Sequence, residues 1–461
     1  MIICIGDGSS ASDIAAQEIA QARNLNYYGV LDANTKIENG VYHTSDIDIN
    51  LQYLIDIIDD NTEISELENA DKELVIVARQ HSIRKILEDN SSFCAMGWTS
   101  ILQDGNHYRF CCEQKSPITI SDDFDYETNK DIKHAQQLML QGLPVPQCKN
   151  CVQGEQDGRS SIRKLRTREL ATLIGAISIE EITNSKLVDY DVRIGNQCNA
   201  QCRMCRSEDS RLIDIEYTQL GLQPQELGAI PSTSFDLIDL STAKRVYVAG
   251  GEPAISKEFM IFLQKCIDHE RTDIELRMNT NAYVIPKRFL ELLENFANIE
   301  FNVSVDGIGE LLYYIRYPIT WEKLANNIEL LKQYGNISFG HNIQLYNIVG
   351  MYDMFKYFDT HYSDQKSVVG FVDMPERFWF GNYPDKQGAL EEVQKCKTLI
   401  RYAYDIAFAK NIDYIEKTLT DTEVDTDVLQ EFYKFNDLLD HSRSVYLKDY
   451  LPILDAQRRE R

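Results

Sequence analysis

Cys198-Asn-Ala-Gln-Cys202-Arg-Met-Cys205 decides how this sequence is interpreted, because its three cysteines have the spacing C-x3-C-x2-C. The segment 187–194 before it alternates apolar and polar residues as a strand does. The three thiols are therefore predicted to converge on a loop that leaves a strand. Three cysteines leave one iron of a four-iron cluster without a protein ligand, and an open metal position invites a substrate or cofactor. The alternative is three core or zinc-binding cysteines.

A second motif follows the segment 243–249, which is predicted to be a buried strand and runs into Gly250-Gly251-Glu252-Pro253. Two glycines let a ligand approach the backbone, and a carboxylate beside them accepts charge-assisted hydrogen bonds from an ammonium group. Taken alone, this motif is also typical of an ordinary turn.

Together, the two motifs resemble those of the radical S-adenosylmethionine (radical SAM) superfamily. The resemblance implies a [4Fe-4S] cluster whose open iron is chelated by the amino and carboxylate groups of S-adenosyl-L-methionine (SAM), with the ligands Cys198, Cys202 and Cys205. It also implies a binding site for the methionine amino group at Gly250, Gly251 and Glu252.

Later segments alternate between strand and helix patterns. Strands are predicted at 273–278, 299–304, 338–347 and 368–373, and helices at 287–296 and 321–331. This order predicts an α/β fold, a partial (β/α)6 TIM-like barrel with chemistry at the C-terminal strand ends. The resemblance makes Ser304 and Asn347 candidates to contact the ribose or carboxylate of the cofactor. The alternative for both is an ordinary polar strand end.

A second group of cysteines lies upstream: Cys94, the adjacent pair Cys111 and Cys112 after the hairpin dipeptide Asp104-Gly105, and Cys148-x2-Cys151. Four such ligands suit zinc or an iron–sulfur cluster, and spacing does not separate the two. The group resembles the twitch or SPASM-type domains of some radical SAM proteins. That resemblance implies an auxiliary iron–sulfur cluster, expected to be [4Fe-4S], on Cys94, Cys111, Cys148 and Cys151. Cys112 remains an alternative to Cys111. In most such proteins the domain follows the barrel, whereas here it precedes it.

Four regions are predicted: a small α/β domain of unknown role at 1–88, the auxiliary-cluster domain at 89–170, the radical SAM barrel at 180–385 and a helical C-terminal region at 386–461. The turn after Ile5 has a degenerate dinucleotide-binding pattern with Asp32 as a ribose acid, although its serines also suit a helix cap. Cys266 is expected in the core. Cys396 is a less favoured further auxiliary ligand.

Composition narrows the classes of function. The 461 residues carry 47 basic and 72 acidic side chains, a net charge of −25, which disfavours bulk nucleic acid as a partner. No apolar run approaches the roughly 20 residues of a membrane span, and the start lacks a leader pattern, so we expect a cytoplasmic protein. Thiols stay reduced there, which favours metal ligation over disulfides for the eleven cysteines.

The resemblance therefore predicts an enzyme that takes an electron from flavodoxin or ferredoxin and cleaves SAM to a 5′-deoxyadenosyl radical. The radical would abstract hydrogen from a peptide or small-metabolite substrate. The rival hypothesis is a non-catalytic iron–sulfur or zinc protein on a degenerate barrel. The sequence leaves the substrate, the oligomeric state and the role of the first 88 residues open.

Overall fold

The computed structural model describes residues 2–6, 27–32, 41–43, 48–50, 83, 85–105, 107–114, 118–119, 125–157, 161–230 and 235–458. The chain divides into two compact units. The first contains Met1–Thr99, Asp125–Lys186 and Ile400–Ala409, and the second contains Ser100–Phe124, Leu187–Leu399 and Lys410–Arg461. No helix within the described ranges is both long and apolar enough to span a bilayer.

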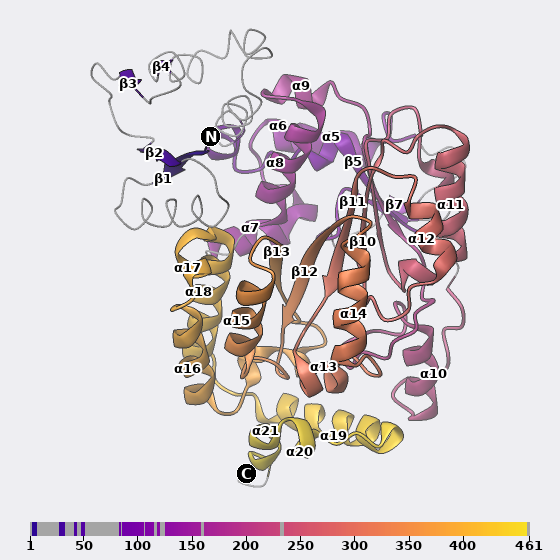
Figure 1. The fold of residues 1–461 in the computed structure, drawn as a ribbon, viewed down its shortest axis with the longest axis vertical. Helices are drawn as coiled ribbons and strands as arrows, with labels where there is room; N and C mark the ends of the chain where they lie inside the picture. Colours follow the sequence, from indigo (N-terminus) through magenta and orange to yellow (C-terminus); the bar gives the residue numbers. More distant parts are fainter. Residues whose placement is uncertain are drawn as a thin grey trace. The chain divides into compact units, whose positions relative to one another are not determined.

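A mostly parallel sheet forms the centre of the second unit (Figure 1). Its strand order is β13-β12-β11-β10-β9-β8-β5-β6-β7. Six strands follow one another in chain order and run parallel: β8 (Asp189–Arg193), β9 (Arg245–Ala249), β10 (Glu275–Thr280), β11 (Ile299–Ser304), β12 (Asn336–Ile343) and β13 (Lys366–Phe371). The predicted α/β fold is therefore confirmed, with six parallel strands in a sheet consistent with the predicted partial barrel.

Helices connect these strands and cover one face of the sheet. They are α10 (Arg211–Gln219), α11 (Lys257–Asp268), α12 (Lys287–Leu293), α13 (Gly309–Ile315), α14 (Trp321–Leu331) and α15 (Met351–His361). In β11 the residues Ile299, Phe301 and Val303 are buried, whereas the polar residues between them are less so. Phe339 of β12 packs on Phe358 of α15, with ring centroids 4.4 Å apart. Apolar side chains therefore face the helices.

The opposite face of the sheet is polar. Arg277 pairs with Glu300 at 3.1 Å, and Glu300 accepts a hydrogen bond from Ser338 Oγ at 2.9 Å. Further along the same strands, Asn302 Nδ2 donates to Asn279 Oδ1 at 2.7 Å. Side chains alternate along a strand, so the face that carries Ser304 is lined by partly exposed polar groups.

Several strand boundaries differ from those expected, and the differences at the C-terminal ends of β10 and β12 bear on the site. β10 continues to Thr280, two residues beyond the predicted end. β12 ends at Ile343, so Asn347, predicted inside this strand, lies in the turn that follows. The prediction was wrong here because Asn347 bonds to the backbone of its own turn and ends the strand early.

A three-stranded extension joins the edge of the sheet at β8. β5 (Ser100–Asp104) pairs with β8 in parallel, and β6 (His107–Arg109) and β7 (Ile118–Thr119) follow antiparallel. The predicted hairpin at Asp104-Gly105 is confirmed, since Asp104 pairs with His107. The sequence places this extension in the expected auxiliary-cluster domain at 89–170. It enters the barrel sheet because β5 is buried and Ser100 Oγ donates to Asp189 Oδ2 at 2.6 Å.

The first unit is mainly helical after residue 83. It contains α5 (Met96–Thr99), α6 (Lys130–Leu140), a 3-10 turn at Pro146–Cys148, α7 (Lys149–Gln156), α8 (Ile162–Ile174), α9 (Ile179–Thr183) and α17 (Ile400–Tyr404). In its first residues β1 (Ile2–Gly6) and β2 (Tyr27–Asp32) pair in parallel, and β3 (Val41–His43) pairs antiparallel with β4 (Asp48–Asn50). The expected turn at 7–13, helix at 14–20 and strand at 74–78 lie outside the described residues.

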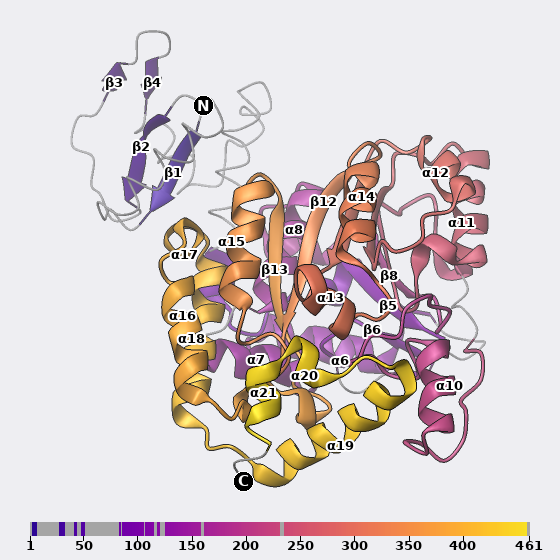
Figure 2. The ribbon, with the colours of Figure 1, turned by 60° about the horizontal axis from the view of Figure 1, so that its bottom comes forward.

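The C-terminal region is helical, as expected, with α16 (Lys386–Cys396), α18 (Ile406–Asp421), α19 (Thr426–Arg443), α20 (Leu447–Tyr450) and α21 (Pro452–Ala456). Figure 2 shows α19 running between α21 and α10. Cys266 of α11 and Cys396 of α16 are both fully buried, and the core position expected for Cys266 is confirmed.

Candidate functional site

The C-x3-C-x2-C segment forms the loop between β8 and α10. Its backbone runs beside the end of α13, because Gln201 N donates to Tyr317 O at 2.7 Å and Arg203 N donates to Ile315 O at 2.8 Å. Cys202 is buried, whereas Cys198 and Cys205 are partly exposed. The loop thus presents its three cysteines at the C-terminal end of the first barrel strand.

The three thiols lie close enough for their charges to act on one another. Burial raises the pKa of Cys198 to about 12, with the charge of Cys202 as the next cause. Burial also raises the pKa of Cys205, and the charges of Cys202 and Cys198 add to it. Within the described ranges, no three His, Cys, Asp or Glu side chains are arranged to hold a single metal ion. Three thiolates of one loop are instead the donor set of an iron–sulfur cluster with one open iron.

The Gly-Gly-Glu motif is joined to the start of this cysteine loop through the backbone. Gly251 N donates to Gly195 O at 2.9 Å, and Glu252 N donates to Gln197 O at 2.8 Å. A Cβ atom on Gly251 would lie 2.2 Å from Gln197 O, so only glycine allows this approach. The two motifs that the sequence analysis linked by resemblance are therefore adjacent in the structure.

The Glu252 side chain joins the ends of β9 and β10. Its Oε1 accepts from Thr280 Oγ1 at 2.7 Å and from Ala254 N at 3.2 Å, and its Oε2 accepts from Asn281 N at 2.8 Å. Glu252 is only 1% exposed, and burial raises the pKa of its carboxyl group to about 7 despite these donors. One lone pair of Oε2 remains for a further donor.

Asn281 is a site residue to which the sequence analysis gave no role. Its Nδ2 donates to Asn199 Oδ1 at 2.8 Å and lies 3.6 Å from Cys198 Sγ. The only signal in the sequence is the run Asn279-Thr280-Asn281 at the end of a predicted strand. Its position at the C-terminal end of β10 places an amide beside a cysteine sulfur.

Arg316 and Asp306 form a second pair that the sequence analysis did not identify. Arg316 Nη1 lies 3.8 Å from Cys202 Sγ, and its Nε and Nη2 bind Asp306 Oδ2 at 2.8 and 2.7 Å. Asp306 Oδ1 accepts from Asn342 N at 2.8 Å. Burial raises the pKa of Asp306, whereas the Arg316 charge opposes that shift. The pair brings a positive charge to a cysteine sulfur.

Ser304 and Asn347 differ in what their side chains do. Ser304 ends β11 and is partly exposed on the polar face of the sheet. Asn347 Nδ2 donates to the carbonyl oxygens of Asp306 and Asn342, and its Oδ1 accepts from Gln344 N. These bonds within the described residues favour the structural alternative for Asn347, which holds the turn after β12.

Gln344 lies in the same turn, but its side chain makes no hydrogen bond to the described residues. It is fully buried, yet neither atom of its side-chain amide has a hydrogen-bond partner among the described residues. No pattern in the sequence indicates this position.

The first unit brings together three of the four expected auxiliary ligands: Cys94, Cys148 and Cys151. Burial raises the pKa of Cys148 to about 12, and the charges of Cys94 and Cys151 add to it. Arg163 stabilises this arrangement, because its Nε and Nη2 bind Glu155 at 2.9 and 2.8 Å and its Nη1 donates to Phe93 O at 2.9 Å. Cys111 and Cys112 belong to the second unit.

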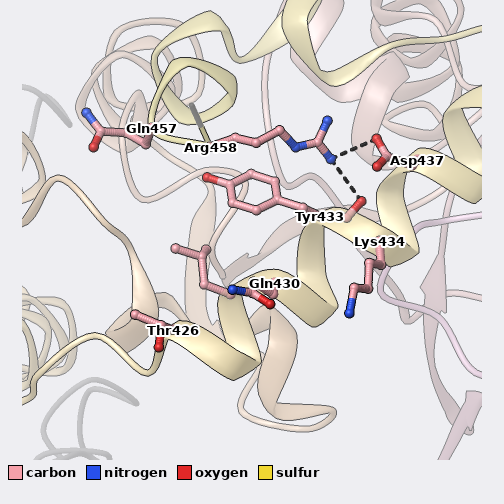
Figure 3. Close-up of a pocket in the computed structure, with 8 residues that line it drawn as sticks. Thr426, Gln430, Tyr433, Lys434, Asp437, Gln457 and Arg458 are labelled. Atoms are coloured by element: carbon pink, nitrogen blue, oxygen red, sulfur yellow. Dashed lines mark hydrogen bonds and ion pairs between the residues drawn. The ribbon is translucent and has the colours of Figure 1, made fainter. Parts of the chain in front are cut away.

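A cavity of about 550 Å³ lies elsewhere in the second unit, on α19 and α21 (Figure 3). Its lining contains none of the residues predicted for the site: Thr426, Leu429, Gln430, Tyr433, Lys434, Asp437, Gln457 and Arg458. Arg458 Nη2 donates to Tyr433 O and to Asp437 Oδ1, which closes one side of the cavity.

Comparison with known families identifies the barrel. Residues 192–356 match the family model of the radical SAM superfamily, from the end of β8 into α15. The match includes the cysteine loop and the Gly-Gly-Glu motif. Residues 192–356 are therefore a radical SAM domain, and the prediction of a radical SAM enzyme is confirmed for this part of the chain.

Two curated proteins resemble part of this radical SAM enzyme. The probable GTP 3′,8-cyclase of Methanocaldococcus jannaschii is 28% identical over 122 residues, which are 26% of this chain and 37% of that protein. The GTP 3′,8-cyclase of Aliarcobacter butzleri is 26% identical over 150 residues, which are 32% of this chain and 44% of that protein. The matched part thus spans less than half of each relative.

Solved structures also show similarity. Streptococcus suis SuiB bound to precursor peptide SuiA is 11% identical, with 71% of this chain and 61% of that chain covered and a TM-score of 0.29. The structure of anSMEcpe with bound AdoMet is 18% identical, with 38% and 47% covered and a TM-score of 0.30. Scores this low say nothing about the substrate of this radical SAM enzyme.

Proposed function

We propose that this radical SAM enzyme cleaves SAM reductively at a [4Fe-4S] cluster held by Cys198, Cys202 and Cys205. The 5′-deoxyadenosyl radical then abstracts hydrogen from a peptide or small-metabolite substrate. One observation supports this most directly: the Gly251 and Glu252 backbone is hydrogen-bonded to the loop that carries the cysteines. A carboxylate suited to an ammonium group is thereby placed next to the predicted iron ligands.

The donor set fits such a cluster. Thiolates are needed for iron ligation, yet burial raises the pKa values of all three thiols. Arg316 opposes that shift at Cys202, because a positive charge 3.8 Å from the sulfur favours the thiolate. The Asn281 amide is a neutral hydrogen-bond donor 3.6 Å from Cys198 Sγ. When bound, the cluster and SAM supply one-electron cleavage chemistry, and the protein supplies ligation, orientation and exclusion of water.

Other residues would orient SAM. Glu252 would hold the methionine ammonium through the remaining lone pair of Oε2, because its negative charge favours a charged donor. Gly250 and Gly251 allow the ligand to approach the backbone. Ser304, on the polar face at the end of β11, is the proposed contact to the ribose or carboxylate. The favoured role of Asn347 is to stabilise the turn around Asp306. A direct contact to the cofactor is its less favoured role.

The proposed substrate class follows from the polarity of the sheet face and the net charge, and the proposed electron donor from the need for a one-electron reductant. Flavodoxin or ferredoxin would deliver the electron. The polar face of the sheet suits a hydrophilic substrate, either a peptide or a small metabolite, and GTP is a small-metabolite candidate named by the relatives. The net charge of −25 disfavours bulk nucleic acid and assists a basic peptide.

We also propose an auxiliary iron–sulfur cluster, expected to be [4Fe-4S], on Cys94, Cys148 and Cys151. The mutual influence of their charges supports the grouping. The proposed fourth ligand is Cys111, and comparison of Cys111→Ala with Cys112→Ala decides between the two adjacent cysteines. Zinc in place of iron is the competing occupant of these ligands.

The decisive experiment is anaerobic reconstitution followed by iron and zinc analysis and an assay for 5′-deoxyadenosine. We expect about eight irons per chain, given two four-iron clusters. Changing Cys198, Cys202 and Cys205 to Ala should remove about half of the iron and all formation of 5′-deoxyadenosine in the presence of dithionite and SAM. The Cys94, Cys148 and Cys151 triple variant should lose the other half yet keep some cleavage. About four irons with one zinc would refute the auxiliary cluster, and SAM cleavage by the Cys202→Ala variant would refute the mechanism.

A further inference from the structure

We propose that Arg203 is a positioning residue that couples the cysteine loop to helix α19, so that the C-terminal region sets how the loop holds its cluster. This inference rests on the proposed function, because it assumes a cluster on that loop. It adds a role for the C-terminal helices, which carry none of the motifs that identify the superfamily in this chain.

Arg203 lies between two of the proposed ligands, Cys202 and Cys205, and its side chain is fully buried. Its Nε donates to Tyr314 O at 2.8 Å, and its guanidinium carbon lies 3.6 Å from the centroid of the Tyr314 ring. The same arginine donates through its backbone N to Ile315 O at 2.8 Å. Arg203 therefore fixes the loop against the end of α13, from which Arg316 reaches Cys202.

The outer nitrogens of Arg203 bind the C-terminal helix. Nη1 donates to Asn436 Oδ1 at 2.9 Å, and Nη2 pairs with Asp440 Oδ1 at 2.7 Å and donates to Val445 O at 3.2 Å. Asp440 and Asn436 are themselves buried. A planar guanidinium with partners at all three nitrogens has one orientation, and lysine offers no such fork.

A second link joins α19 to the loop through Glu216 of α10. Arg443 binds Glu216 with Nε at 2.9 Å and Nη2 at 2.5 Å, and Glu216 also accepts from Gln201 Nε2 at 3.2 Å. Gln201 lies between Cys198 and Cys202. The segment 201–203 is thus tied to α19 at two points, through Asn436 and Asp440 to Arg203 and through Arg443 to the partner of Gln201.

The third link reaches the last cysteine. Tyr217 OH donates to Cys205 O at 3.2 Å, and the Tyr217 ring packs edge-on against Phe435 of α19 at 5.7 Å. A loop without regular structure has few internal bonds to define its shape, so contacts from one rigid helix define it instead. Loosening these contacts should change the cluster and not only the global stability.

The test measures the cluster in the reconstituted full-length protein. We compare Arg203→Lys, which keeps the charge but loses the fork, with Asp440→Asn, which keeps the shape but removes the negative charge. Both should lose cluster iron to a chelator several-fold faster than the unmodified protein. Asp440→Asn should also raise the midpoint potential of the cluster, because the Arg203 charge, one residue from Cys202, loses its carboxylate partner, whereas Arg203→Lys should shift the potential little.

Asp437→Asn is the matched control. Asp437 lies on the same helix, is largely exposed and binds Arg458 at the cavity of Figure 3, so its substitution should leave iron loss and potential unchanged. If Arg203→Lys fails to fold, the Asp440→Asn result decides. Iron-loss rates and potentials equal to those of the control, in folded variants, would overturn the inference. Absence of any reducible cluster on Cys198, Cys202 and Cys205 in the unmodified protein would instead overturn the proposed function.

Discussion

Arg316 Nη1 lies 3.8 Å from Cys202 Sγ, and Asp306 holds the guanidinium there with two hydrogen bonds. The three side chains are all buried. A carboxylate, a guanidinium and a cysteine sulfur therefore form a chain that spans the C-terminal ends of two barrel strands. The arginine is placed to stabilise a thiolate without being a ligand itself.

Arg316→Met should destabilise the protein strongly, because it leaves the Asp306 carboxylate buried without its partner. We expect a loss of about 3–5 kcal/mol in the free energy of unfolding, measured by urea denaturation of the iron-free protein. The control is Arg288→Met, which removes an exposed pair with Glu291 and should cost at most about 1 kcal/mol. Equal effects of the two substitutions would contradict the role of the pair.

Binding of SAM should depend on pH through Glu252. Burial raises the pKa of this carboxyl group to about 7, and only its ionised form is an ion-pair partner for ammonium. Affinity should therefore fall by up to about tenfold for each pH unit below 7 and level off above it. Equilibrium binding to reconstituted protein measures this. Glu252→Gln should bind more weakly and lose the dependence, and a variant that keeps the same pH profile would disprove the assignment.

The raised pKa of Glu252 also makes the folding stability of the SAM-free protein depend on pH. A carboxyl group with a raised pKa favours folding while it is protonated, so this contribution is full below its usual pKa of 4.5 and is lost as the pH rises through about 7. The difference in unfolding free energy between the unmodified protein and Glu252→Gln isolates it from other titrating groups. A difference that does not change with pH would contradict the shift.

Gly251→Ala should disturb the cysteine loop, because the added Cβ would lie 2.2 Å from Gln197 O. Overpacking of this kind costs about 1–3 kcal/mol, and we expect lower iron content after reconstitution as well. Gly221→Asn is the control, since a Cβ there meets no atom within 4 Å and asparagine tolerates its φ of +69°. Full iron content in Gly251→Ala would show that the close approach is unimportant.

Gln344→Met should stabilise the free protein. The substitution is close in shape and removes two buried amide atoms that have no partner among the described residues. We expect a gain of about 1–3 kcal/mol in chemical denaturation. The neighbouring Asn347→Leu should have the opposite sign, because all three of its hydrogen bonds would be lost. If Gln344→Met is destabilising, the amide has a partner that the structure does not show.

Local patterns predicted the regular elements well. The strand expected at 299–304 and the helix expected at 321–331 coincide with β11 and α14, since one face of each is buried against the core. The boundary of β12 could not be found in the same way. Its end depends on the side-chain bonds of Asn347, which compete with the strand ladder.

Contacts between segments that are distant in the chain could not be predicted from the sequence. Arg316 lies 114 positions from Cys202, and Arg203 lies 233 positions from Asn436, so no local spacing connects either pair. The cysteine motif and the Gly-Gly-Glu motif could be named because each is compact. The residues that hold the two motifs in place could not be predicted, because they meet the motifs only after the strands have paired in the folded protein. The parallel pairing of β5 with β8 is another contact between distant segments that the sequence could not predict.

That pairing also constrains how the chain can fold during synthesis. β5, β6 and β7 leave the ribosome before β8, so the hairpin must wait for its parallel neighbour while the intervening residues of the first unit are made. Until then β5 presents an unpaired backbone edge, a feature prone to wrong association. The same topology means that expression of a fragment beginning at residue 187 would remove three strands from the sheet. Shortened versions for crystallisation should therefore begin upstream of Cys94 and β5.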